Sequence, residues 1–332
     1  MSTVLVTGAT GFLGGALARR LYNSDFQVLA TGRNRQALTA LSLPASNKIT
    51  CDFSKPLPAE IQTHFNDVDI IVHCAALSSA WGRDADFWDS NVLATEQLLT
   101  IARSINVDHF IHISTPAVYF KFEDQFDVRE TRVLPSPVNA YARTKAVAEE
   151  RVLASGVPAT IMRPRGIYGV GDSALMPRLL RAAQSGPLPR FRNGSVRTDI
   201  THIDDVVDAI IAAFKAKRTA IGEVFNVSGG DAIPIVEIAE RACSAYGTNV
   251  RWRDLPVGIA LLLTKMNEKV ARLRKEQSEP RITAYGLGVF AYSQTLDISK
   301  ARTLLDWVPK VSFDEGLRRT FQHFDKLNND GA

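Results

Sequence analysis

The chain has 332 residues, of which 45% are hydrophobic and 22% are charged. These ordinary proportions exclude a disordered, collagen-like or coiled-coil protein, and the length suffices for about two domains or one large α/β unit. The 39 basic and 35 acidic residues give a net charge of +4 without a basic stripe, so no nucleic-acid partner is expected. Three cysteines without metal-ligand spacing predict no metal site and favour a reducing compartment.

Membrane and export signals are not expected in this sequence. The N-terminus has no basic region followed by a signal-like apolar run, so a cytoplasmic location is predicted. The longest apolar stretch, 255–263, contains Pro256 and Gly258 and is shorter than the roughly 20 residues of a spanning helix. The sequence therefore predicts no transmembrane segment.

Short apolar runs alternate with helix-length segments through the first half of the chain. Strands are expected at 4–7, 27–31, 48–51, 69–74, 110–114 and 159–162. Each run is almost continuously apolar, as a strand buried on both faces of a parallel sheet requires. The pattern predicts an α/β fold with a doubly wound parallel Rossmann sheet.

Proline and glycine interrupt this alternation after Arg163. Strands are expected again at 198–202 and 223–227, with a helix over 204–216 between them. We therefore expect a Rossmann domain over 1–165, to which 196–228 returns. The segments 166–195 and 229–332 would form mainly a smaller, interleaved substrate domain.

Three glycines at intervals of three residues lie where the first strand leads into an amphipathic helix expected over 12–22. Gly8, Gly11 and Gly14 permit a tight turn whose backbone can approach a pyrophosphate, and the free N–H groups at the helix start favour the anion. This turn predicts a dinucleotide site. Its expected cofactor-binding residues are Gly8, Thr10, Gly11, Phe12, Leu13 and Gly14.

The end of the second strand favours NADP(H), with NAD(H) as the alternative. Dinucleotide folds that take NAD usually place an acid here to bind the ribose 2′-hydroxyl, whereas this chain has Gly32 followed by Arg33. Arg33, assisted by Arg35, would neutralise a 2′-phosphate, unless both merely solvate a helix start. Asp52 either caps a turn or accepts from the adenine amino group, and we include Phe53 beside it in the cofactor site.

A tyrosine and a lysine lie four residues apart near the start of a helix expected to run to about Ala154. This spacing puts Tyr141 and Lys145 on one helix face, where an ammonium lowers the phenol pKa and also holds the nicotinamide ribose. Thr115, or Ser114 as the alternative, follows the fifth strand and would orient a substrate oxygen toward Tyr141. Together these residues predict a hydride-transfer site.

Further motifs extend the pattern along the chain: His73–Ala76, Asn91–Thr95, Arg163–Gly169, His202–Asp205, Asp297–Ala301 and Leu305–Pro309. With them, the chain resembles the extended short-chain dehydrogenase/reductase superfamily over essentially its full length. Gly166 stands where the sugar-nucleotide epimerases and dehydratases usually carry Asn, so the chain looks more like the 3β-hydroxysteroid dehydrogenase-like branch. The segments 80–82, 114–118 and 163–180 resemble bacterial 2-alkyl-3-oxoalkanoate reductases.

The resemblance implies hydride transfer at a carbon–oxygen bond by the Tyr, Lys and Ser-or-Thr set. It also implies cofactor contact through the backbone after the fourth strand, at Ala75 and Ala76, and a homodimer formed by helices over 87–105 and 139–154. His73 and Asn91 are expected to be structural. The expected substrate contacts are Ser78, Ser79, Trp81 and Arg165, with a plain surface loop or solvated side chains as the alternative.

The segment 255–273 combines leucines with basic residues and predicts an amphipathic lid over an apolar pocket, with peripheral contact to a bilayer left open. The leading functional hypothesis is an NADP(H)-dependent oxidoreductase for a hydrophobic small molecule, a β-keto acid or a steroid-like ketone or alcohol. The alternatives are a sugar-nucleotide epimerase or dehydratase with internally recycled NAD(P), and a non-enzymatic NADP(H) sensor.

Overall fold

The computed structural model describes residues 1–24, 26–273, 280 and 282–329. Its main feature is a seven-stranded sheet with the order β12-β7-β5-β4-β1-β2-β3, in which every neighbouring pair is parallel. The strands are β1 (Thr3–Thr7), β2 (Gln27–Gly32), β3 (Lys48–Thr50), β4 (Ile70–His73), β5 (His109–Ile113), β7 (Ala159–Pro164) and β12 (Val224–Val227). The predicted Rossmann sheet is confirmed.

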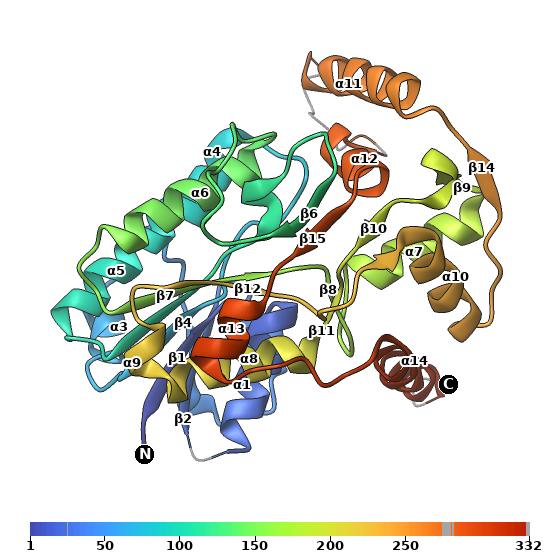
Figure 1. Cartoon of the computed structure of the whole chain (residues 1–332). Coiled ribbons are helices and arrows are strands. Elements are labelled where there is room, and N and C mark those ends of the chain that lie inside the picture. Colours follow the sequence, from blue (N-terminus) through green and yellow to red (C-terminus); the bar gives the residue numbers. More distant parts are fainter. Residues whose placement is uncertain (25, 274–279, 281, 330–332) are drawn as a thin grey trace.

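Helices cover both faces of this sheet (Figure 1). Leu5 and Ile71 point to the face covered by α3 (Ala59–Thr63), α5 (Ala94–Ser104) and α6 (Ala140–Leu153). Val4 and Val72 point to the opposite face, under α1 (Phe12–Tyr22), α8 (Ile203–Lys215) and α13 (Ser299–Leu305). Successive strand residues alternate between faces, so burial on both sides explains the continuously apolar runs.

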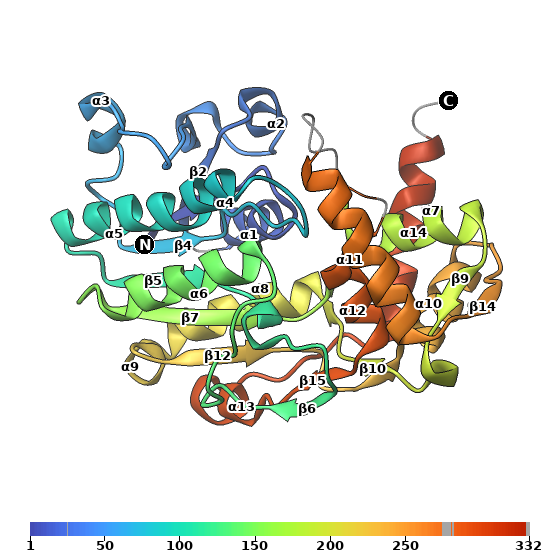
Figure 2. The ribbon, with the colours of Figure 1, turned by 90° about the horizontal axis from the view of Figure 1, so that it is seen from above.

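Smaller sheets lie beyond the carboxyl ends of the large-sheet strands (Figure 2). A four-stranded sheet has the order β13-β10-β15-β6, and two strand pairs are β11-β8 and β14-β9. Their bounds are β6 (Gln125–Val128), β8 (Ile167–Tyr168), β9 (Leu188–Arg190), β10 (Arg197–Thr198), β11 (Thr201–His202), β13 (Ile233–Pro234), β14 (Trp252–Asp254) and β15 (Gln294–Leu296). Around them, α7 (Leu175–Ser185), α10 (Ile235–Ala245) and α14 (Phe313–Asn329) share a separate apolar core.

The single strand predicted over 198–202 is wrong. The segment is divided into β10 and β11, which belong to different small sheets, and neither joins the large sheet. The Asp199 carboxylate, between the two strands, accepts a hydrogen bond from the Leu296 amide at 2.7 Å. The Thr201 amide instead bonds the Gly166 carbonyl at 3.1 Å, so the residues on either side of the break pair with different neighbours.

The helix predicted over 87–105 is interrupted by a wider turn. It comprises α4 (Asp84–Trp88), a π-helical turn at Asp89–Leu93 and α5. Shorter helical segments are α2 (Arg35–Thr39), α9 (Lys217–Ala220), η1 (Ala45–Asn47), η3 (Pro116–Tyr119) and η4 (Arg192–Gly194). The predicted lid segment forms α11 (Val257–Leu273), which packs against α12 (Ala284–Ala291). Among the described residues, none of the helices has the length and apolarity needed to span a bilayer.

Candidate functional site

The glycine turn after β1 has no room for side chains at two of its positions. Gly8 adopts a φ of +65°, and a Cβ atom there would lie 2.7 Å from the Ala75 Cα. A Cβ on Gly14 would lie 2.3 Å from the Gly8 carbonyl oxygen. Both contacts are with backbone, so neither could be relieved by a side-chain rotation. The turn is thereby held tightly between the ends of β1 and β4.

The start of α1 fits an anionic group. Gly11 precedes the helix and provides no side-chain cap, so the free N–H groups of the first turn are available to a ligand such as a dinucleotide's pyrophosphate. Thr10 lies against the end of β2, because a Cβ on Gly32 would come within 2.7 Å of its side chain. Leu13 is buried in the core and Phe12 is half-buried, so Leu13 would meet a cofactor through its backbone.

The residues predicted for the adenosine end lie after β2 and β3. Arg33 and Arg35 are exposed. Burial acts to raise the pKa of Asp52, but hydrogen bonds from Ser54 and the charge of Arg33 outweigh it and lower the pKa. The Asp52 carboxylate accepts from both the amide and the hydroxyl of Ser54, so it caps a turn. Phe53 is 5% exposed and packs against Phe65, so its side chain lies in the core.

Three hydroxyl groups meet at the carboxyl ends of β4 and β5. The Asn139 side chain caps α6 by accepting from the Ala142 amide at 2.8 Å, which places Tyr141 in the first turn of the helix. The Tyr141 hydroxyl forms hydrogen bonds with the side chains of Ser78 and Thr115. We call Ser78, Thr115 and Tyr141 the hydroxyl cluster. Burial raises the pKa of Tyr141, and the two hydrogen bonds only partly offset this effect.

Lys145 lies one turn further along α6 and is 1% exposed. Its Nζ donates to the Ile113 carbonyl at 2.7 Å and to His112 Nε2 at 3.0 Å. Burial lowers the pKa of Lys145 to about 8, against the opposing charge of Glu149. The expected lowering of the Tyr141 pKa by Lys145 is not seen in this structure, because the ammonium is directed to Ile113 and His112 while Tyr141 is desolvated.

Ser114 is not brought to the hydroxyl cluster. Its hydroxyl donates to the Glu149 carboxylate, which also accepts two hydrogen bonds from Arg163. Arg163 in turn donates to the Tyr119 hydroxyl, which donates to the Asn226 side chain at 3.0 Å. Ser114 therefore belongs to a buried polar network between β5, α6 and β7. Sequence reasoning missed Glu149, although its spacing four residues after Lys145 was an available signal.

His73 holds the backbone around the glycine turn. The Thr7 hydroxyl accepts from the Ala75 amide and donates to His73 Nδ1 at 2.8 Å, because the neutral ring carries its proton on Nε2. Nε2 donates to the Thr95 hydroxyl at 3.0 Å, because that hydroxyl itself donates to the Asn91 carbonyl. Burial, with the Lys145 charge, lowers the His73 pKa to about 3. The ring is neutral, and its role is structural, as expected from the sequence.

The loop after β4 carries the other predicted substrate contacts. The Asn91 side chain fixes this loop by bonding both the amide and the carbonyl of Leu77. Ser79 bonds the Trp81 carbonyl at 2.8 Å and accepts from its amide, so its hydroxyl is used within the loop. The Arg272 guanidinium of α11 lies 4.9 Å from the Trp81 ring centre. Helix α11 thus contacts the loop that supplies Ser78.

Arg165 follows β7 and is 7% exposed. It bonds the Thr198 hydroxyl at 3.2 and 2.9 Å and also donates to Gln294. Within the described part of the chain it forms no ion pair with a carboxylate within 4.0 Å. Tyr285 of α12 interacts electrostatically with both Arg165 and Tyr141, so all three groups lie in the same part of the molecule. Burial raises the pKa of Tyr285 to about 12.

Tyr285 was missed by sequence reasoning. It occurs in the apolar segment Ala284–Ala291, where its ring packs edge-on against Phe120 at 5.2 Å. A single tyrosine in such a segment has no local pattern that predicts a site. Its relation to Tyr141 arises only from the packing of α12 against Phe120 and Phe122, in the segment that follows η3.

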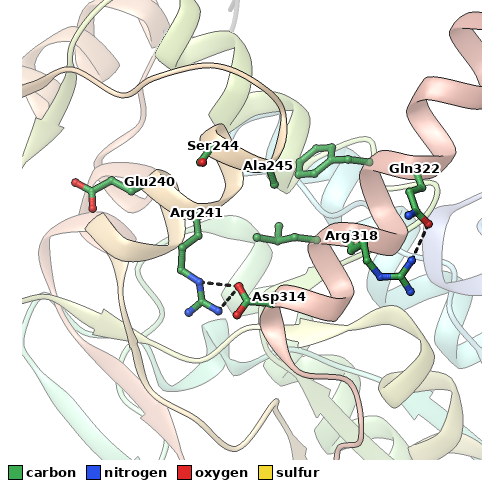
Figure 3. A pocket seen from close by; sticks show the side chains of 9 residues that line it. Glu240, Arg241, Ser244, Ala245, Asp314, Arg318 and Gln322 are labelled. Carbon is green, nitrogen blue, oxygen red and sulfur yellow. Dashed lines mark hydrogen bonds and ion pairs between the residues drawn. The ribbon is translucent and has the colours of Figure 1, made fainter.

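A surface pocket of about 590 Å³ lies elsewhere, between α10 and α14 (Figure 3). Its charged groups already have partners: Arg241 bonds Asp314, Arg318 pairs with Glu315, and Glu240 accepts from the Trp252 indole. None of the residues that line it is a predicted site residue. The pocket is therefore separate from the hydroxyl cluster.

Comparisons with known proteins bear on this site. The model of the NAD dependent epimerase/dehydratase family matches residues 4–228, which include the glycine turn, Tyr141 and Lys145. The 2-alkyl-3-oxoalkanoate reductase of Stenotrophomonas maltophilia is 30% identical over 95% of this chain and 97% of its own length. The sterol-4-alpha-carboxylate 3-dehydrogenase ERG26 of Saccharomyces cerevisiae is 26% identical over 98% of this chain and 99% of its own.

A solved structure extends the likeness to three dimensions. The UDP-glucuronic acid 4-epimerase of Bacillus cereus, in complex with UDP-glucuronic acid and NAD, is 26% identical and superposes with a TM-score of 0.76. The match covers 98% of this chain and 99% of the epimerase chain. The likeness therefore includes the small sheets and the helices around them.

Proposed function

Because the chain belongs to the NAD dependent epimerase/dehydratase family and is an enzyme of the extended short-chain dehydrogenase/reductase type, we propose that it is an NADP(H)-dependent oxidoreductase. It would move a hydride between nicotinamide and a hydrophobic ketone or secondary alcohol. The observation that carries this proposal is the hydroxyl cluster, which lies at the carboxyl edge of the sheet beside the glycine turn. Ligands bind at this edge in open α/β sheets.

The residues divide the chemistry between them. The dinucleotide, when bound, supplies or accepts the hydride at the substrate carbon. Thr115 holds the carbonyl oxygen by a hydrogen bond, and Tyr141 gives its phenolic proton to that oxygen, so that the ketone becomes an alcohol. Lys145, with a pKa of about 8, is mostly an ammonium at neutral pH; it would stabilise the phenolate left on Tyr141 if its ammonium turned from Ile113 and His112 toward that oxygen. The reverse oxidation uses the same groups.

The preference for NADP(H) rests on the end of β2. No acid follows Gly32, the Asp52 carboxylate is occupied by Ser54, and Arg33 and Arg35 are exposed where a 2′-phosphate would lie. A guanidinium pairs well with a phosphate. We expect Arg33→Ala to lower kcat/KM for NADPH about tenfold and to leave that for NADH nearly unchanged. Steady-state kinetics with both cofactors test this, with exposed Arg19→Ala of α1 as the matched control.

The activity itself is tested by the loss of NADPH absorbance with a panel of hydrophobic ketones and β-keto acids, run in parallel with NADH. We expect consumption that prefers NADPH. The absence of consumption with every ketone would overturn the proposal. Cofactor retained through purification, together with turnover of a nucleotide sugar without net NADPH loss, would instead favour an epimerase or dehydratase.

The backbone at Gly166 supports the reductase over that alternative. Gly166 has a φ of +53°, and a Cβ there would lie 3.1 Å from both the Asp199 carbonyl oxygen and the Ile200 side chain. The asparagine usual in sugar-nucleotide enzymes tolerates this φ but would be crowded by the Asp199 carbonyl and the Ile200 side chain. A non-enzymatic NADP(H) sensor is less favoured because the hydroxyl cluster and Lys145 are in place.

Within the hydrophobic substrates, we propose one that carries a carboxylate, such as a 2-alkyl-3-oxo acid. The buried Arg165 guanidinium feels the charge of the Asp199 carboxylate but forms no direct ion pair with it, so it is suited to pair with an anionic ligand group. Its electrostatic link through Tyr285 to Tyr141 supports a carboxylate held on the same side of the site as the reacting carbonyl. The names of the Stenotrophomonas reductase and of ERG26 both include such a carboxylate.

The substitution Arg165→Gln tests this pairing. A 2-alkyl-3-hydroxy acid does not decarboxylate before the assay, so its oxidation by NADP⁺, followed as NADPH formed, is compared with oxidation of its methyl ester. We expect kcat/KM for the acid to fall about 10- to 100-fold, because a charged hydrogen bond is lost, and kcat/KM for the ester to change little. An equal loss for both substrates would show that Arg165 only supports the fold.

The remaining expectations are also proposals. We propose a Rossmann domain over 1–165 with 196–228, and a substrate domain formed mainly by 166–195 and 229–332. The separate core of α7, α10 and α14 supports this division, whereas α13 packs on the large sheet. We propose a homodimer through the helices of 87–105 and 139–154, on which Trp88 and Leu153 are 39% and 53% exposed. We also propose a cytoplasmic location.

A further inference from the structure

Helix α11 exposes an apolar side of its surface. Of the seventeen large apolar side chains that are exposed among the described residues, six belong to this one helix, with exposed fractions from 50% to 88%. We call these six the apolar stripe: Ile259, Leu262, Leu263, Met266, Val270 and Leu273. At 100° per residue they fall within an arc of about 100°. Figure 1 shows α11 along the outside of the molecule.

The other side of α11 already has its contacts within the protein. Thr264 and Ala271 are buried, and Ala260 and Leu261 pack into a small apolar cluster with α12. The Glu268 side chain accepts from the Ala284 amide at the start of α12 at 2.8 Å. The apolar stripe is therefore not needed to dock α11 on the rest of the chain.

Basic side chains follow one border of the stripe. Lys265, Lys269 and Arg272 are exposed and lie next to it on the helical wheel, whereas Glu268, the single acid of α11, is turned toward α12. The Lys265 ammonium lies 5.1 Å from the Phe122 ring centre, so the border also touches the body of the protein. An apolar face bordered by cations is complementary to a bilayer with anionic headgroups.

We propose that the apolar stripe of α11 docks on an anionic phospholipid bilayer, with the helix lying in the plane of the interface. A helix of 17 residues spans about 25 Å and buries one face only, so binding is reversible and weakened by salt. The contact between Arg272 and Trp81 links this surface to the loop of Ser78. Docking therefore brings the hydroxyl cluster close to a lipid phase from which an apolar substrate can be taken.

The test is co-sedimentation of the full chain with phosphatidylcholine vesicles that contain or lack phosphatidylglycerol. We expect binding to the anionic vesicles that falls in high salt. The double variant Leu262→Ser/Met266→Ser is expected to lose at least about tenfold in the partition coefficient. Lys265→Glu/Lys269→Glu is expected to lose the preference for phosphatidylglycerol. The matched control Phe126→Ser/Val133→Ser removes exposed apolar side chains elsewhere and is expected to bind as the wild type does.

Circular dichroism and thermal unfolding check that each variant is folded, and sedimentation equilibrium reports its oligomeric state. Wild-type chain that ignores anionic vesicles, or a stripe variant that binds them equally well, overturns the proposal. Dissociation of a dimer by the stripe variant overturns it too, because the stripe would then be an interface between two copies. Reduction of a water-soluble ketone is expected to be unchanged in all these variants.

Discussion

Replacing Tyr141 by phenylalanine is expected to lower kcat by about 10²- to 10⁴-fold, the range for removal of a general acid. The substitution deletes only the hydroxyl that bonds Ser78 and Thr115, so the ring still fills its half-buried place in α6. Turnover of NADPH with a reactive ketone measures kcat, and fluorescence titration measures NADPH affinity. We expect that affinity to change less than about threefold, because the phenol proton acts in the transition state.

Tyr246→Phe is the matched control for this experiment. Tyr246 is 42% exposed at the end of α10, where its ring lies near Phe321 and far from the sheet edge that carries Tyr141. It is expected to keep wild-type kcat. A Tyr141→Phe enzyme that retains more than about a tenth of the wild-type rate would place the proton donor elsewhere.

Replacing Glu149 by alanine is expected to lower the free energy of unfolding by about 3–5 kcal/mol. Glu149 and Arg163 form an ion pair whose side chains are 3% and 5% exposed, and Glu149 also accepts from Ser114. Removal of the carboxylate leaves the Arg163 guanidinium buried without an opposite charge, which costs far more than the loss of the attraction. Urea unfolding followed by circular dichroism measures this difference.

An exposed ion pair in the same layer of helices provides the comparison. Glu96 of α5 accepts from Arg151 of α6 at 2.9 Å, with 39% and 54% of the two side chains exposed. Glu96→Ala is therefore expected to change the free energy of unfolding by no more than about 1 kcal/mol. If Glu149→Ala lowered the free energy of unfolding by as little as Glu96→Ala, the buried network would stabilise the fold no more than an exposed ion pair does.

The features that could be predicted from the sequence are each determined by residues that are close together along the chain. The apolar strands, the glycine turn and the spacing of Tyr141 and Lys145 each lie within a short segment. Each pattern can therefore be recognised without knowing how the rest of the chain folds. The structural role expected for His73 also followed from its place at the end of a buried strand. The family resemblance then combined these local signals.

The features that could not be predicted depend on contacts between distant segments. Ser114 and Thr115 are adjacent, so the sequence offers both as candidates for the same role. The hydrogen bond from Ser114 to Glu149 shows that Ser114 belongs to the buried network instead. The residues around Arg165 in the sequence do not distinguish it from an ordinary surface arginine. Its burial depends on Thr198 and Gln294, which are distant in the chain and accept hydrogen bonds from it. The division of 198–202 into two strands likewise depends on a distant residue, because the Leu296 amide donates a hydrogen bond to the Asp199 carboxylate between the two strands.

The position of β12 has a consequence for the order in which the protein is completed on the ribosome. Six strands of the large sheet lie between residues 3 and 164, and β12 adds to the outer edge of β7 only after residue 227 has been made. Asn226 of β12 is also the residue that accepts from the buried Tyr119 hydroxyl. A nascent chain that lacks β12 therefore presents an open strand edge and an unfinished polar network to chaperones, long after Tyr141 has been synthesised.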